Sequence, residues 1–85
     1  MYTTKIFVAY DAPECETIGA AETMDEAIML VIRYMYSHDY VCKHFSHDEE
    51  YTVISYEHDY RIGPEMNTIN GTISIMATAL FKSDE

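Results

Sequence analysis

Histidine and cysteine side chains lie close together in the middle of the sequence and could bind a metal ion. They are His38, Cys42, His44 and His47. Imidazole and thiolate are the ligand types that zinc prefers in proteins. If the segment were helical, His38 and Cys42, four residues apart, would share one face of a turn, as would His44 and His47, three apart. No recognised zinc spacing is matched, so a zinc site, with Asp48 as a further ligand, is an alternative and the leading interpretation contains no metal.

Carboxylates also stand next to histidines, as catalytic pairs often do in space. The two places are His47-Asp48 and Glu57-His58-Asp59. Consecutive residues of a strand point to opposite faces, so these carboxylates cannot orient the imidazole beside them. The sequence has no serine nucleophile elbow, phosphate-binding loop or HExxH motif. We therefore expect a protein that is not an enzyme and that uses no cofactor.

The acidic residues are the strongest chemical signal in the chain. Its 85 residues include 15 Asp and Glu against 5 Lys and Arg, which gives a formal net charge of −10. Such a field repels nucleic acid and anionic membranes and attracts basic proteins. We expect no direct nucleic-acid binding and no membrane association, and a basic protein or nucleoprotein complex as the partner.

The acids come in short groups, some of them beside tyrosines. On a strand, residues two apart are separated by about 6.7 Å, a spacing that can follow the phosphates of a nucleic-acid strand. Tyrosines next to such a row would act as rigid amphipathic anchors in a protein interface. The predicted partner-binding residues are Asp48, Glu49, Glu50, Tyr51, Tyr56, Glu57, Asp59 and Tyr60. The alternative for any one group is charge that serves solubility alone.

Length and composition predict a single folded domain over residues 1–85. Hydrophobic residues make up 48 % of the chain, and there are only 3 glycines and 2 prolines, which is not the composition of a disordered acidic tail. The N-terminal residues lack the charged start and long apolar stretch of a secretion signal. Cys15 and Cys42 have no CxxC spacing. These features predict a cytoplasmic protein with free thiols.

The first half of the chain predicts one strand and one helix. Residues 3–10 are rich in β-branched and aromatic types and predict a strand, and 11–16 predict a loop around Pro13. Thr23, followed three residues later by Glu26, is a capping box, in which the threonine hydroxyl accepts from the Glu26 amide and Glu26 reaches back. Apolar residues at helical spacing then predict a helix from residue 25 to about residue 37.

The second half predicts strands separated by a polar connection. Residues 38–50 show no clear period, so they predict a connection or a frayed extension of the helix. Residues 51–60 alternate as a half-buried strand that ends at Gly63-Pro64, and 72–82 alternate as a last strand. Asn70-Gly71 favours a tight turn, which would make 65–69 a short extra strand.

These elements predict an α+β fold: an antiparallel sheet of three to four strands with one helix packed on one face, in the order β-α-β-β. A single helix covers only part of such a sheet. Tyr51 or Tyr56 would then be half exposed on the uncovered part, which predicts a protein partner or a homodimer. The alternative is that these tyrosines lie at the edge of the core and expose only their hydroxyls.

The overall character of the chain resembles a known group of proteins. Acidic groups at Glu14 and Glu16, at 48–50 and at Glu57 and Asp59, on a short tyrosine-rich domain, resemble the small acidic proteins that phages and mobile elements use against host defences. That group includes anti-CRISPR inhibitors and anti-restriction DNA mimics. The resemblance covers general character and no motif, so no family site is carried over by position.

The resemblance implies a non-enzymatic inhibitor in the host-cell cytoplasm that occludes the nucleic-acid-binding surface of a CRISPR or restriction nuclease complex. The residues leave two alternatives open. One is a small zinc-binding regulatory or structural module that uses the histidine and cysteine segment. The other is a homodimeric accessory subunit whose uncovered sheet face is its own interface.

Overall fold

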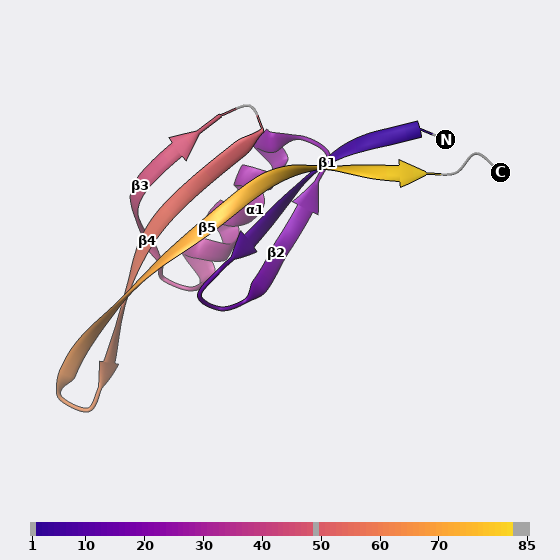
Figure 1. Ribbon diagram of the computed structural model, residues 1–85. Coiled ribbons are helices and arrows are strands. Elements are labelled where there is room, and N and C mark those ends of the chain that lie inside the picture. The colour runs from indigo at the N-terminus through magenta and orange to yellow at the C-terminus, as the bar shows by residue number, and fades with distance from the viewer. Residues whose placement is uncertain (1, 49, 83–85) are drawn as a thin grey trace.

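The computed structural model describes residues 2–48 and 50–82, and the side chains of residues 5–48 and 50–78. The described chain forms one antiparallel sheet and one helix (Figure 1). In sequence order the elements are β1 (Tyr2–Asp11), β2 (Glu16–Ala21), α1 (Met24–Ser37), β3 (Val41–His47), β4 (Tyr51–Ile62) and β5 (Glu65–Lys82). The strands lie side by side in the order β2-β1-β5-β4-β3, so the longest strand, β5, is at the centre.

The predicted fold class is wrong in the number and order of its strands. The sheet has five strands and the chain is mostly sheet, whereas the sequence predicted three to four strands in the order β-α-β-β. The two strands that the prediction lacks, β2 and β3, are the edge strands. Seven consecutive exposed residues in β3 show no alternation of burial, so hydrophobic pattern could not reveal it. Backbone hydrogen bonds to β4 hold it instead.

The predicted turn at Asn70-Gly71 is also wrong. Both residues lie inside β5, paired with Glu57 and Tyr56 of β4. The turn of this hairpin is at Gly63-Pro64, the place where the strand predicted over residues 51–60 was expected to end. Gly63 has a φ of 59°. That left-handed conformation suits glycine, and it allows the chain to reverse within two residues.

The helix prediction is confirmed, with α1 beginning one residue earlier than expected. The Glu26 amide donates to the Thr23 hydroxyl at 3.2 Å, as the capping box predicts. The Glu26 carboxylate accepts from the same hydroxyl at 3.0 Å, rather than from the Thr23 amide. One stripe of the helix is buried and consists of Met24, Ala27, Val31 and Met35.

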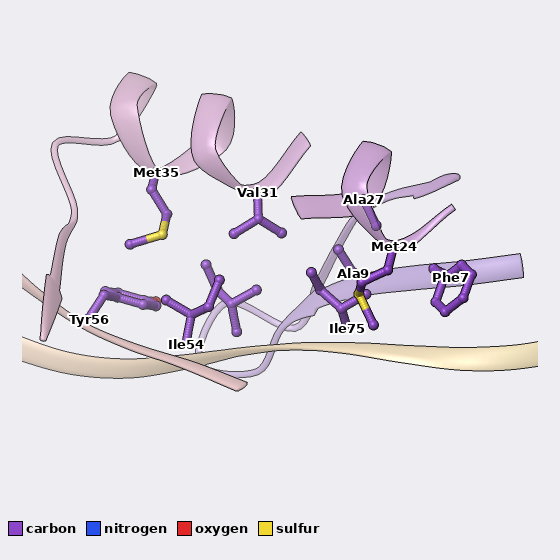
Figure 2. Close-up of a cluster of buried hydrophobic side chains, with 10 residues drawn as sticks. Phe7, Ala9, Met24, Ala27, Val31, Met35, Ile54, Tyr56 and Ile75 are labelled. Atoms are coloured by element: carbon purple, nitrogen blue, oxygen red, sulfur yellow. The ribbon is translucent and has the colours of Figure 1, made fainter. Parts of the chain in front are cut away.

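The core lies between this helical stripe and one face of the sheet (Figure 2). Alternate residues of the three central strands point toward the helix, and we call this face the helix-side face. In β4, residues 52, 54 and 56 are buried, and Ile73 and Ile75 of β5 are fully buried, so the predicted alternation of both strands is confirmed. The buried sheet residues of the cluster are Phe7, Ala9, Ile54, Tyr56, Ile73 and Ile75.

The opposite face of the sheet, which we call the open face, has no helix of the described residues against it. Residues on it alternate with the buried ones, and several are large and apolar. Tyr10, Tyr51 and Met76 have exposed fractions of 38 %, 45 % and 52 %. Tyr51 and Met76 are register partners on β4 and β5, so they are direct neighbours across the strands.

One end of the sheet continues as a two-stranded arm. Pairing of β3 with β4 ends at Glu57, and pairing of β1 with β5 ends at Ile73. Residues 58–69, which we call the arm, therefore pair only with each other, and they project from the body of the protein (Figure 1). The molecule is elongated, with extents of 61 × 24 × 16 Å. Within the described residues, no helix has the length and apolar character needed to cross a membrane.

Candidate functional site

The predicted acidic residues lie along β4 and at the turn that precedes it. Asp48 and Glu50 are exposed in the turn, and Glu50 contacts Lys5 of β1 at 2.7 Å. Glu57 and Asp59 follow the open-face alternation of β4, at the root of the arm. Asp59 accepts a hydrogen bond of 2.6 Å from Thr68. Glu49 lies outside the described residues.

The three predicted tyrosine anchors are divided between the two faces. Tyr51 is exposed on the open face beside Met76. Tyr60 is half buried on the other side of the sheet. The expectation that Tyr56 is half exposed is wrong, because its exposed fraction is 2 % and Met35 of α1 lies above it (Figure 2). Tyr56 thus belongs to the core and is not available to a partner.

The helical geometry of the alternative zinc site is wrong, because the segment forms β3. Cys42 pairs with Tyr56, a helix-side residue, whereas His44 pairs with Ser55 on the open face, after a shift of register. The His47 Nδ1 atom hydrogen-bonds the Thr52 hydroxyl at 2.9 Å. His38 lies at the C-terminal end of α1. Within residues 2–48 and 50–82, no three side chains of metal-ligating type are gathered into a cluster.

A buried carboxylate that the sequence analysis assigned to a loop lies under the helix. Asp11 is the last residue of β1 and has an exposed fraction of 0 %. It accepts hydrogen bonds from the hydroxyls of Tyr34 at 2.6 Å and Tyr56 at 2.8 Å. Burial, followed by the bonds to Asp11, raises the pKa of both tyrosines well above the ordinary value. The signal for Asp11 was the β1 alternation, since it follows Phe7 and Ala9 on the helix-side face.

Aromatic rings continue from this carboxylate toward the surface. Tyr40 stacks on Tyr56, with ring centroids 4.1 Å apart and planes 7° apart. The His38 ring lies 4.2 Å from Tyr34 and 5.4 Å from Tyr40, and His58 lies 5.2 Å from Tyr40. Residues far apart in sequence thus form one cluster of rings at the root of the arm, where α1 ends and the β1–β2 turn lies (Figure 1).

These rings line a hollow with a volume of about 370 Å³, which we call the arm-root hollow. Two carboxylates from the β1–β2 segment complete its wall, and the wall contains no Lys or Arg. The lining residues are Glu14, Glu16, Tyr34, His38, Tyr40, His58, Tyr60 and Ile69. Of these, the sequence analysis had singled out Glu14, Glu16, His38, His58 and Tyr60, but for other roles or other sites.

The two histidines of the hollow have unused hydrogen-bonding capacity. The His38 Nδ1 atom lies 2.8 Å from the Tyr34 carbonyl oxygen, which can only accept, so Nδ1 carries the proton. In the neutral ring, Nε2 is then left as an acceptor. The Nδ1 atom of His58 is buried and has no hydrogen-bond partner among the described residues.

Comparison of the chain with protein-family models, characterised proteins and solved structures finds no match. Two features of the molecule itself therefore carry the functional argument. One is the open face with its flanking acids, and the other is the arm-root hollow.

Proposed function

We propose that this protein is a non-enzymatic acidic binding protein that docks its open face on the basic nucleic-acid-binding surface of a larger protein. The observation that carries the proposal is the open face itself. It presents the exposed side chains of Tyr51 and Met76, and the acidic residues Glu57 and Asp59 follow them on the same face of β4, toward the arm.

The charge of the molecule supports a basic partner. Among the side chains of residues 5–48 and 50–78, two ion pairs form, Lys5 with Glu50 and Lys43 with Glu57. Both are exposed, and pairs of this kind hold charges together only weakly. With a net charge of −10, the field outside the protein is therefore negative, and it accelerates encounters with positively charged surfaces.

The apolar part of the open face supports a protein rather than a small cation as the partner. A depression of about 390 Å³ is lined by Val8, Tyr10, Ser74, Met76 and Thr78. Tyrosine and methionine are residue types enriched in protein interfaces, where they supply contact area that charge alone does not. An apolar centre with acidic residues at one end suits a basic groove that has an apolar floor.

The resemblance to phage-encoded anti-defence proteins indicates the kind of partner that we propose. The partner would be a CRISPR or restriction nuclease complex in the cytoplasm of the host cell. Occupying the nucleic-acid-binding groove would block it sterically, without any chemical step. The slim cross-section of 24 × 16 Å is compatible with entry into such a groove.

The experiment that tests the proposal is capture from a bacterial lysate across a salt series, followed by competition. The immobilised protein should retain a nucleic-acid-binding complex at moderate salt, and duplex DNA or guide RNA should displace it. Retention that nucleic acid does not reduce would show that another surface of the partner is bound. Retention of no basic protein would contradict the proposal.

Two matched variants then assign the surface. Glu57→Gln with Asp59→Asn removes two charges from the open face, and Glu22→Gln with Asp25→Asn removes two exposed charges near the start of α1. We expect the first variant to associate several-fold more slowly at low salt, and the second to stay close to the wild type. Equal rates for the two variants would remove the open face from consideration.

The exposed apolar residues of the open face also favour a second candidate, a homodimeric accessory subunit. The mass in solution at micromolar concentration separates the two functions, because a dimer built on the open face would bury Tyr51 and Met76. Tyr51→Ser with Met76→Ser should convert such a dimer to a monomer. A dimer that dissociates in this variant would contradict docking of the open face on another protein.

A further inference from the structure

The arm-root hollow lies on the helix-side face, opposite the open face. A ligand bound there would therefore not occupy the surface used in the proposed function. We propose that this hollow binds a guanidinium group. Its aromatic walls, its carboxylates and its unpaired hydrogen-bond acceptors all match that one ligand chemistry.

The rings offer surfaces for a delocalised cation. A guanidinium is attracted to the face of an aromatic ring within about 6 Å of its centroid, and it stacks well because it is planar. Tyr34, Tyr40 and Tyr60 all line the hollow, and the Tyr40 ring is held in place by its stacking on Tyr56 at 4.1 Å. An aromatic wall fixed in this way needs no reordering when a ligand enters.

The hydrogen-bonding groups of the hollow are mostly acceptors. A guanidinium has five N–H donors and no acceptor, so it requires such surroundings. The carboxylates of Glu14 and Glu16 accept, and neither forms an ion pair among the described side chains. Nε2 of His38 is an acceptor in the neutral ring. A guanidinium would supply the missing donors.

A buried negative charge beneath the hollow adds to the attraction. Asp11 is fully buried, and no Lys, Arg or His side chain among the described residues pairs with it. The Tyr34 hydroxyl links it to the wall, since it lies 2.6 Å from Asp11 and 3.5 Å from Glu16. Buried charges are normally compensated by a partner of opposite sign. A cation in the hollow would compensate the charge of Asp11, with only the Tyr34 hydroxyl between the two.

These observations favour guanidinium over other cations. A quaternary ammonium would use the rings but would leave the acceptors unpaired, and a compact ammonium would pair with a carboxylate but stack poorly. The volume of about 370 Å³ admits the group together with part of an alkyl stem. The source of the group is either an arginine side chain of another protein or a free alkylguanidine.

The test is a titration of the ¹⁵N-labelled full-length protein, followed by amide chemical shifts at low salt. The ligands are methylguanidinium, methylammonium and tetramethylammonium, and for the two sources capped arginine (N-acetyl-arginine N-methylamide) and agmatine. We expect shifts centred on His38, Tyr40 and His58. Methylguanidinium should bind at least about fivefold more tightly than either of the other two small cations.

The last two ligands identify the source. Tighter binding of capped arginine than of agmatine would support an arginine side chain, and the reverse would support a free alkylguanidine. No localised shift at about 10 mM methylguanidinium would overturn the proposal, since such a small ligand is expected to bind in the millimolar range. Equal binding of tetramethylammonium would overturn it as well, because the acceptors would then play no part.

Variants connect the binding to the hollow. Glu14→Gln with Glu16→Gln should weaken binding of capped arginine at least about fivefold, whereas Glu22→Gln with Asp25→Asn, which removes the same charge elsewhere, should change it little. An equal loss of affinity in both variants would show that only the net charge of the protein matters, which would contradict the proposal. The selectivity among small cations is measured on the unaltered protein, so it decides the question even if a variant fails to fold.

Discussion

The ring of Tyr56 lies across Gly71, its register partner on β5. A Cβ atom added to Gly71 would lie 2.7 Å from Tyr56 Cε2 and would overlap the Cζ and hydroxyl oxygen atoms of the same ring. The missing side chain thus leaves the space in which the tyrosine ring lies flat on the sheet. From that position the Tyr56 hydroxyl reaches Asp11 at 2.8 Å, and its ring supports Tyr40 at the edge of the arm-root hollow.

Gly71→Ala should destabilise the protein. Because the methyl group and the Tyr56 ring would need the same space, we expect the free energy of unfolding to fall by about 1–3 kcal/mol. Urea unfolding measures it, with the exposed neighbour Thr72→Ser as a control that changes stability little. In a Tyr56→Leu background the cost of Gly71→Ala should be smaller. An equal cost in both backgrounds would show that the ring is not the cause.

Tyr56→Phe removes only the hydroxyl that donates to Asp11. A hydrogen bond to a charged group is worth about 1.5–3 kcal/mol, so we expect a loss of stability in that range. Tyr34→Phe removes the other donor, and the double variant should lose more than the sum, because Asp11 is then left buried without a donor. Tyr36→Phe, at a residue with an exposed fraction of 86 %, is the control. If the stability loss of the double variant equals the sum of the two single losses, the two hydroxyls do not act together on Asp11.

Alkaline pH should unfold the protein through the same tyrosines. Their pKa values are raised in the folded state, so above pH of about 10 the unfolded chain loses protons that the folded chain keeps. The free energy of unfolding is therefore unaffected by these groups below pH 10 and falls as the pH rises above it. Of the eight tyrosines, Tyr34 and Tyr56 should ionise only with unfolding, which tyrosinate absorbance and circular dichroism measured together would detect.

In Tyr34→Phe the dependence of stability on pH above 10 should become less steep, because one of the two protons is no longer involved. Tyr36→Phe should leave it as in the wild type. A titration in which all tyrosines ionise before the circular dichroism changes would contradict the burial of these hydroxyls.

Thr23→Ala should weaken the start of α1. The Glu26 amide would lose its acceptor, and such a loss at an N-cap costs about 0.5–2 kcal/mol. Thr23→Asn, which retains a capping oxygen, should recover most of the stability. Thermal unfolding measures both variants, and equal melting temperatures for Thr23→Ala and the wild type would show that the cap contributes nothing.

Local patterns determined the elements that pack against each other in the core. The capping box and the helical spacing of Ala27, Val31 and Met35 predicted α1, and the alternation around Ile54 and Ile73 predicted two central strands and the faces that they bury. Each of these signals is read within about ten residues, and burial of one face reinforces it. The predicted positions of Glu57 and Asp59 on one strand face follow from the same period.

Only the tertiary structure decided the edge strands, the central position of β5 and the site at the root of the arm. The exposed residues of β3 carry no hydrophobic period, since backbone pairing with β4 is what makes them a strand. Asn70-Gly71 favours a turn locally, but continuous pairing with β4 and the fit of Tyr56 over Gly71 make it a strand. Asp11, Tyr34, Tyr40 and His58 come from four separate segments. Their contacts depend on how the helix and the arm pack, which no local period encodes.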